Sequence, residues 1–144
     1  MTKPQIALEI AWEDPADHMI AASVIASNGR FSGASQFYCY PNTLISWARD
    51  LDGFPRSARD SRELKVGGPD AYTDIAFDFR CFDEAGHTSV RAAIRESTQT
   101  AKHSPKDRVV LELRFEAAAL DRFVEQLHSL GTEKAGVAVL DGIA

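Results

Sequence analysis

The chain has 144 residues, of which 44% are hydrophobic and 26% are charged. A chain of this length and composition forms a globular domain with its own core, which excludes a globally disordered protein and one that needs metals or disulfides to fold. The formal net charge of −5 argues against nucleic acid as the main partner, because nucleic-acid-binding domains usually carry a basic patch.

No apolar stretch is long enough to span a membrane, and the first residues lack the pattern of a signal peptide. We therefore expect a cytoplasmic protein without a membrane segment. Cys39 and Cys81 fall on the apolar sides of predicted strands, so we expect buried free thiols rather than a disulfide.

Alternating apolar and polar residues predict three strands in the first half, at about residues 5–12, 19–26 and 31–40. The residues expected on the apolar sides of the first and third strands are Ile6, Leu8, Ile10, Trp12, Phe31, Phe37 and Cys39. Asn28-Gly29 lies between the second and third strands and is typical of a type I′ hairpin turn.

A helix is predicted after Pro41, with Asn42 or Thr43 as its cap and an end near residues 53–55. Its inward stripe is Leu44, Trp47, Ala48 and Leu51. The polar connector that follows contains a short edge strand at residues 63–66.

The second half repeats this layout. Strands are predicted at residues 72–82, 88–95 and 109–115, with a turn around Gly86 between the first two. A helix follows, with its apolar stripe at Leu120, Phe123, Val124, Leu127 and Leu130 and its end at Gly131. Strands that are apolar on one side and charged on the other indicate an antiparallel sheet covered on one face only.

These elements predict a single α+β domain over residues 1–144, in a βββα-βββα layout with both helices on the apolar face. The halves are about residues 5–54 and 72–131, the connector is 55–71 and the tail is 132–144. The tail is expected either to add an edge strand or to fray. The two helix stripes correspond at a constant spacing of 76 residues. Two explanations stay open: an internal duplication, or the fact that two helices that each cover a sheet need the same spacing of apolar residues.

We find no catalytic motif in the sequence. The four histidines have no metal-ligand spacing, the cysteines form no Cys-x-x-Cys pair, and no phosphate-binding loop or nucleophile elbow is present. We therefore predict no catalytic residues, no metal site and no cofactor, and we expect that the protein is not an enzyme.

The charged side of the second set of strands is the main candidate surface. It is expected to present Asp74, Asp78, Arg80, Arg91, Arg95, Glu112 and Arg114. Three interpretations stay open: a cross-strand lattice of ion pairs, a binding face, or a pocket in which Asp74 or Asp78 is a base beside arginines.

Three stretches resemble small bacterial immunity proteins related to WapI, the antitoxin of a wall-associated toxin. They are the strand and helix of residues 37–51, the strand and turn of residues 75–87 with Gly86-His87, and the strand and closing helix of residues 115–130. The resemblance covers about residues 20–131. It implies a cytoplasmic, non-enzymatic protein that binds and neutralises a toxin, and it implies no catalytic residues.

The leading hypothesis is therefore a non-enzymatic binding protein with a protein partner, namely a toxin domain. One alternative is a small enzyme or ligand-binding domain that uses the gap between the helices and the sheet. Another is a homo-oligomer, such as a homodimer, built through an exposed strand edge.

Overall fold

The structure of the chain is a computed structural model that describes residues 3–68, 71–97 and 106–143. Within these ranges it has eight strands and two helices. Their bounds are β1 Gln5–Glu13, β2 Ile20–Ser27, β3 Ser32–Cys39, α1 Pro41–Leu51, β4 Ser61–Val66, β5 Thr73–Cys81, β6 Thr88–Ser97, β7 Lys106–Phe115, α2 Ala117–Glu133 and β8 Val137–Asp141. The predicted α+β class is confirmed, and the tail adds a strand, β8. No described helix is long and apolar enough to cross a membrane.

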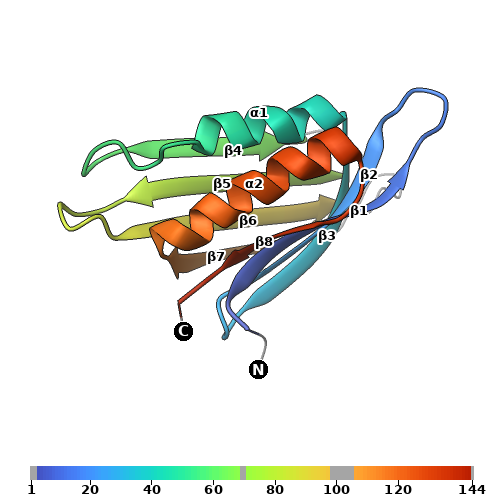
Figure 1. Cartoon of the computed structure of the whole chain (residues 1–144). Helices are drawn as coiled ribbons and strands as arrows, with labels where there is room; N and C mark the ends of the chain where they lie inside the picture. Colours follow the sequence, from blue (N-terminus) through green and yellow to red (C-terminus); the bar gives the residue numbers. More distant parts are fainter. Residues whose placement is uncertain (1–2, 69–70, 98–105, 144) are drawn as a thin grey trace.

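The strands form two antiparallel sheets of four strands each. Sheet A has the order β3-β2-β1-β8 and sheet B the order β4-β5-β6-β7. The two helices lie next to each other over one face of sheet B, and α2 also packs along β8 of sheet A (Figure 1). The predicted βββα-βββα layout thus becomes βββαβ-βββαβ, because a strand follows each helix.

The two βββαβ repeats exchange their last strands. β4 follows α1 of the first repeat but pairs with β5 of the second, and β8 follows α2 but pairs with β1 of the first. The pairing of β2 with β3 can be aligned with the pairing of β6 with β7. Corresponding residues of β2 and β6 are then 68 positions apart in the sequence, and those of β3 and β7 are 76 positions apart. Each repeat therefore needs the other to complete its sheet.

The apolar faces of both sheets and both helices share one core, in which aromatic residues from distant segments meet. The Trp47 ring of α1 lies between Phe37 of β3 and Phe77 of β5, at centroid distances of 6.0 and 6.1 Å. Phe79 and Phe115 meet edge to face at 5.8 Å. Such edge-to-face contacts add stability beyond the area they bury.

Sheet A meets sheet B where β3 crosses the ends of the strands of sheet B. Gly33 of β3 lies on Val109 of β7, and a Cβ at Gly33 would overlap Val109 Cγ1. Further along β3, the Ser35 hydroxyl donates a hydrogen bond of 2.5 Å to Glu96 Oε2 of β6. The crossing brings a strand of the first repeat against two strands of the second.

The helices run close together because α2 has a glycine at their contact. Gly131 lies inside α2, where a Cβ would be 2.8 Å from the Pro41 carbonyl oxygen and would overlap Ile45 of α1. The prediction that the helix ends at Gly131 is wrong. It ends at Glu133, and Lys134 takes the left-handed conformation with φ of 58°. Gly131 serves close helix packing, which the helical periodicity alone cannot indicate.

Two local predictions are also corrected. The residue before α1 is Tyr40, and Asn42 and Thr43 lie inside the helix, because Pro41 suits a first helical position that needs no N–H donor. In the β2–β3 hairpin Asn28 donates to the Phe31 carbonyl, so the central residues are Gly29 and Arg30. Of Gly29 and Arg30, only Gly29 has a positive φ. A type I′ turn requires a positive φ at both central residues, whereas a type II′ turn requires it only at the first.

Candidate functional site

All seven residues predicted for the charged face lie on the outer face of sheet B. Pairing across the sheet places them in rows: Asp74 beside Arg95, Asp78 and Glu112 on either side of Arg91, and Arg80 and Arg114 on either side of Ser89. The register of β5, β6 and β7 therefore brings together side chains that are up to 40 residues apart in the sequence.

Ion pairs connect six of the seven residues. Arg80 Nη2 is 2.6 Å from Asp78 Oδ2, Arg91 Nη2 is 3.3 Å from Glu112 Oε1, and Arg95 Nη2 is 3.6 Å from Asp74 Oδ2. Arg80 keeps a raised pKa because it donates hydrogen bonds to the Asp78 carboxylate. The Arg91–Glu112 pair is exposed and contributes little to stability, whereas the Arg95–Asp74 pair is only partly exposed. All three pairs fix the orientations of the side chains.

The seventh residue, Arg114, belongs to a cluster at the β5–β6 turn. Its guanidinium carbon lies 5.7 Å from the centre of the Phe82 ring, which stacks on His87 at 6.0 Å. His87 Nδ1 is 2.6 Å from Asp83 Oδ2, and the His87 backbone N–H donates to Asp83 Oδ1. These hydrogen bonds lower the pKa of Asp83. Gly86 in this turn has a φ of 83°, as predicted.

An uncharged row of three residues crosses β5, β6 and β7 in the middle of the same face, and Lys65 of β4 lies at its end. Ala76, Ala93 and Val110 are paired neighbours on β5, β6 and β7, and the Val110 side chain is 46% exposed. Rows of charged residues flank it on both sides. An apolar centre within a polar, arginine-containing rim is the usual anatomy of a protein–protein interface.

The outer face of sheet A is different, and the prediction of a charged outer face holds only for sheet B. Its strand register leaves Glu9 and Asp141 as the acidic residues on it and no lysine or arginine within β1, β2, β3 and β8. Large apolar side chains are exposed there instead, including Ile25 and Val137.

Trp12 lies on this outer face, and its predicted position in the core is wrong. A β-bulge between Ile10 and Trp12 shifts the register, so Trp12 pairs with Ala21, which in turn pairs with Tyr38. Because a one-residue insertion reverses the side to which the following side chains point, Trp12 is 52% exposed. Alternation could not predict this, since an inserted residue changes the phase of the pattern without any sequence signal.

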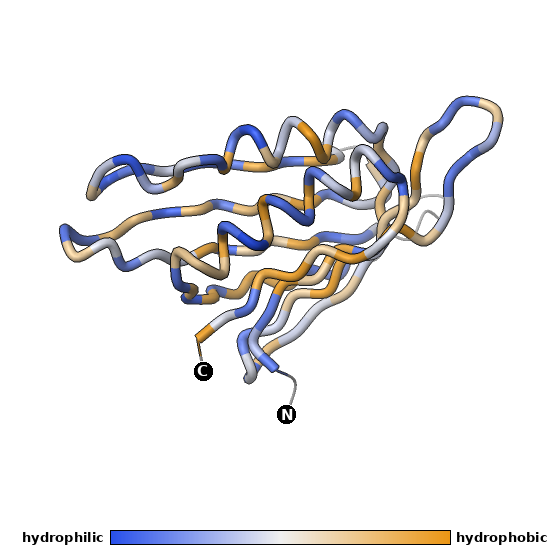
Figure 2. Tube along the Cα trace, viewed as in Figure 1, coloured by the Kyte–Doolittle hydropathy of each residue, from blue (hydrophilic) through white to orange (hydrophobic). Residues whose placement is uncertain are grey.

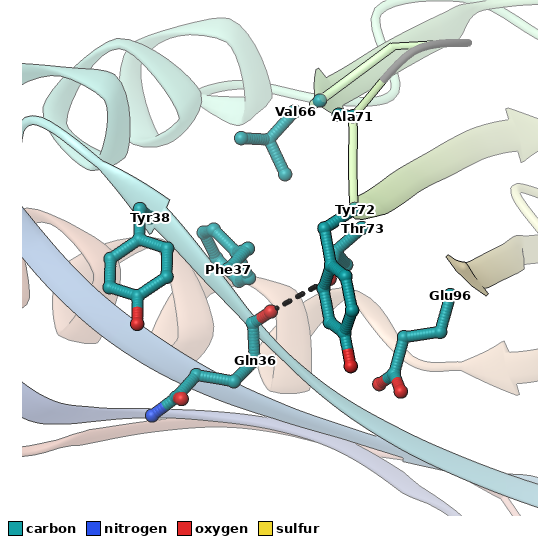
Figure 3. Close-up of a pocket in the computed structure, with 9 residues that line it drawn as sticks. Gln36, Phe37, Tyr38, Val66, Ala71, Tyr72, Thr73 and Glu96 are labelled. Carbon is teal, nitrogen blue, oxygen red and sulfur yellow. Dashed lines mark hydrogen bonds between the residues drawn. The ribbon is translucent and has the colours of Figure 1, made fainter. Parts of the chain in front are cut away.

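A cavity of about 540 Å³ opens where β3 crosses sheet B. The rings of Tyr38 and Tyr72 stand on either side of Phe37, with Val66 beside them, and the Glu96 carboxylate lies on the Tyr72 side (Figure 3). Glu96 is the only acidic residue among the described lining residues, and none of these is a lysine, arginine or histidine. The volume lies within the usual range for ligand-binding pockets.

The open edge of β3 supplies backbone groups to this cavity. The hydrogen bond from Asn28 to the Phe31 carbonyl fixes which β3 residues pair with β2, so Gln36 and Tyr38 direct their N–H and C=O groups away from β2. One of these groups, the Gln36 carbonyl, accepts a hydrogen bond of 3.0 Å from the Thr73 hydroxyl (Figure 3).

The sequence prediction missed Tyr38, Tyr72 and Glu96 as site residues. Tyr38 had the right signal, since it alternates with the apolar residues Phe37 and Cys39 of its strand. Glu96 had none, because it follows the outward-facing Arg95 and its position depends on β3 crossing over it.

No group of three or more histidine, cysteine, aspartate or glutamate side chains in the described ranges could hold a metal ion. Cys39 and Cys81 are buried free thiols, and burial raises the pKa of Cys39 to about 11. Asp74 and Asp78 lie on an open sheet face beside their arginine partners rather than in an enclosed pocket.

A scan against models of known protein families finds no match to this chain, and a search of curated proteins finds none either.

Proposed function

We propose that the protein binds another protein through the outer face of sheet B, and that it acts as an immunity protein that neutralises a bacterial toxin by direct contact. The observation that carries the proposal is the arrangement of that face. An uncharged row of Ala76, Ala93 and Val110 lies between rows of ion-paired charged residues. The resemblance to WapI-related immunity proteins supports the biological role.

The extent of the face, which covers four strands, favours a macromolecular partner. Its side chains belong to four antiparallel strands, and the ion pairs hold several arginines before a partner arrives. Binding then immobilises fewer free side chains, which lowers its entropic cost. Arginine is also among the residues that most often dominate the energy of protein interfaces.

The charges of the face favour an acidic partner surface. Its four rows hold six cationic side chains: Lys65, Arg80, Arg91, Arg95, Arg108 and Arg114. They hold four carboxylates: Glu63, Asp74, Asp78 and Glu112. The face is therefore positive by two charges although the whole chain carries −5. Carboxylates spread among the arginines repel phosphates, which favours protein over nucleic acid.

The test is co-expression with a candidate toxin encoded beside this protein in its genome, with survival and affinity capture as the readouts. We expect the wild-type chain to restore growth and to be captured with the toxin. Arg91→Glu with Val110→Asp should abolish both effects, because the pair of changes reverses a charge and inserts one into the uncharged row.

Arg122→Glu is the matched control, because Arg122 is exposed on α2, away from the outer face of sheet B. It should protect as the wild type does. Equal protection by the face variant, or no capture of the toxin by the wild type, would contradict the proposal.

A further inference from the structure

The exchange of strands makes two corresponding corners of the molecule, and the C-terminal segment closes one of them. After β8 the Gly142 N–H donates to the Pro4 carbonyl at 3.0 Å, and the Ile143 N–H donates to the Arg114 carbonyl at 2.8 Å. Gly142 also packs directly on Leu113. This extended segment thus bridges the start of β1 and the open edge of β7.

No described residue makes such a bridge at the other corner. Aligning the repeats by their strand pairing matches Arg114 with Tyr38, Leu113 with Phe37 and Pro4 with Thr73. No described residue donates a hydrogen bond to the Tyr38 carbonyl, which points away from β2. The cavity lined by Phe37, Tyr38 and Thr73 occupies this corner.

After β4 the described residues make a turn and not an extended segment. Gly67 has a φ of 89°, and the Ala71 N–H donates to the Gly68 carbonyl at 3.1 Å.

We infer that this corner binds an extended segment of a partner protein that carries a lysine or arginine side chain. The backbone of that segment takes the place that Gly142 and Ile143 take at the other corner, and one of its N–H groups donates to the Tyr38 carbonyl. This is addition of a short strand to an exposed edge. The inference goes beyond the proposed function and is independent of the outer face of sheet B.

The side chains of the cavity determine the preference for a cation. Tyr38 and Tyr72 are 59% and 50% exposed, and aromatic ring faces attract ammonium and guanidinium groups. Glu96 uses Oε2 to accept from Ser35, while Oε1 has no hydrogen bond or ion pair to another described residue.

The test is a selection from a displayed library of random heptapeptides on the immobilised full chain, followed by titration of the selected peptides made synthetically. We expect a consensus with lysine or arginine at one position. Tyr72→Ala and Glu96→Gln should each weaken binding at least tenfold. Tyr40→Ala and Glu125→Gln are matched controls with the same residue types, both exposed and outside the cavity lining, and should bind as the wild type does.

A second measurement uses the wild-type chain and so does not depend on how the variants fold. Methylation of each backbone nitrogen of the selected peptide in turn should identify one amide whose loss weakens binding at least tenfold, as a bond to the Tyr38 carbonyl requires. An uncharged or acidic consensus, no consensus, or equal binding to the Tyr72 and Glu96 variants would overturn the inference. So would a dimer in solution that Tyr72→Ala converts to a monomer. None of these results depends on the toxin test.

Discussion

Gly33 of β3 and Val109 of β7 are corresponding residues of the two repeats, and they touch each other where β3 crosses sheet B. A methyl group at position 33 would overlap Val109 Cγ1, and a β-branched side chain has little freedom to move away. We expect Gly33→Ala to lower the free energy of unfolding by about 1–3 kcal/mol, measured by urea denaturation.

Val109→Ala is the partner change for this test. It should recover part of the loss when combined with Gly33→Ala, because it removes the atoms that collide. Strict additivity of the two single effects in a double-mutant cycle would show that the residues are not in contact.

The second prediction concerns Gly131, where we expect the usual effect of a glycine-to-alanine change on helix stability to be reversed. Replacing glycine by alanine inside a helix normally stabilises it by about 1 kcal/mol. At position 131 the added Cβ would meet Ile45 and the Pro41 carbonyl, so we expect Gly131→Ala to lower the melting temperature. Ser129→Ala, at an exposed position of the same helix, should leave it nearly unchanged. A more stable Gly131→Ala protein would mean that the helices lie further apart.

The hydrogen bonds between Asp83 and His87 predict a dependence on acid. They lower the pKa of Asp83 from its ordinary 3.8, so folding favours the ionised carboxylate. This stabilisation is present above about pH 3.8 and is lost as the pH falls through the lowered pKa. Carboxyl NMR titration should show that the pKa of Asp83 rises in His87→Ala. An unchanged pKa of Asp83 in that variant would rule out the side-chain bond.

The buried thiols predict slow reaction with thiol reagents. Cys39 and Cys81 are each only 6% exposed, and the raised pKa of Cys39 leaves little reactive thiolate at pH 8. We expect neither thiol to react with a disulfide reagent within minutes in the native protein, and both to react at once in urea. Rapid reaction of a native thiol would place that cysteine at the surface.

The exchanged strands predict that the chain can be divided between the repeats. Fragments 1–70 and 71–144 each lack the strand that completes one of the sheets. We expect each fragment alone to lack a cooperative unfolding transition. An equimolar mixture should recover the circular dichroism spectrum of the intact protein as a 1:1 complex. Cooperative unfolding of either fragment alone would contradict the need for exchange.

Much of the fold follows from periodicity in the sequence. The alternation of Ile75, Phe77 and Phe79 with charged residues predicted β5 and its two faces, and the same pattern in β6 and β7 placed all seven charged residues together. The helical stripe at Leu120, Phe123 and Leu127 predicted the buried side of α2 in the same way. Side chains that repeat with a regular period show which face of an element is buried.

The rest depends on contacts that have no period. The bulge that exposes Trp12 changes the phase of its strand, and the crossing of β3 over Glu96 brings Ser35 of the other repeat to it. The hydrophilic tip of the β1–β2 hairpin, which projects from the body, is visible in the sequence only as a turn (Figure 2). The cavity needs residues of β3, β4, β5 and β6 at once, and no local pattern contains all of them.

The exchange of the last strands also explains why the two corners of the molecule differ. A polypeptide with one βββαβ unit would complete its sheet only by pairing with an identical molecule, and in that symmetric assembly a free chain end would close both corners alike. Joining the two units in tandem turns one of those ends into a linker. A single covalent connection is then enough to make the two corners differ.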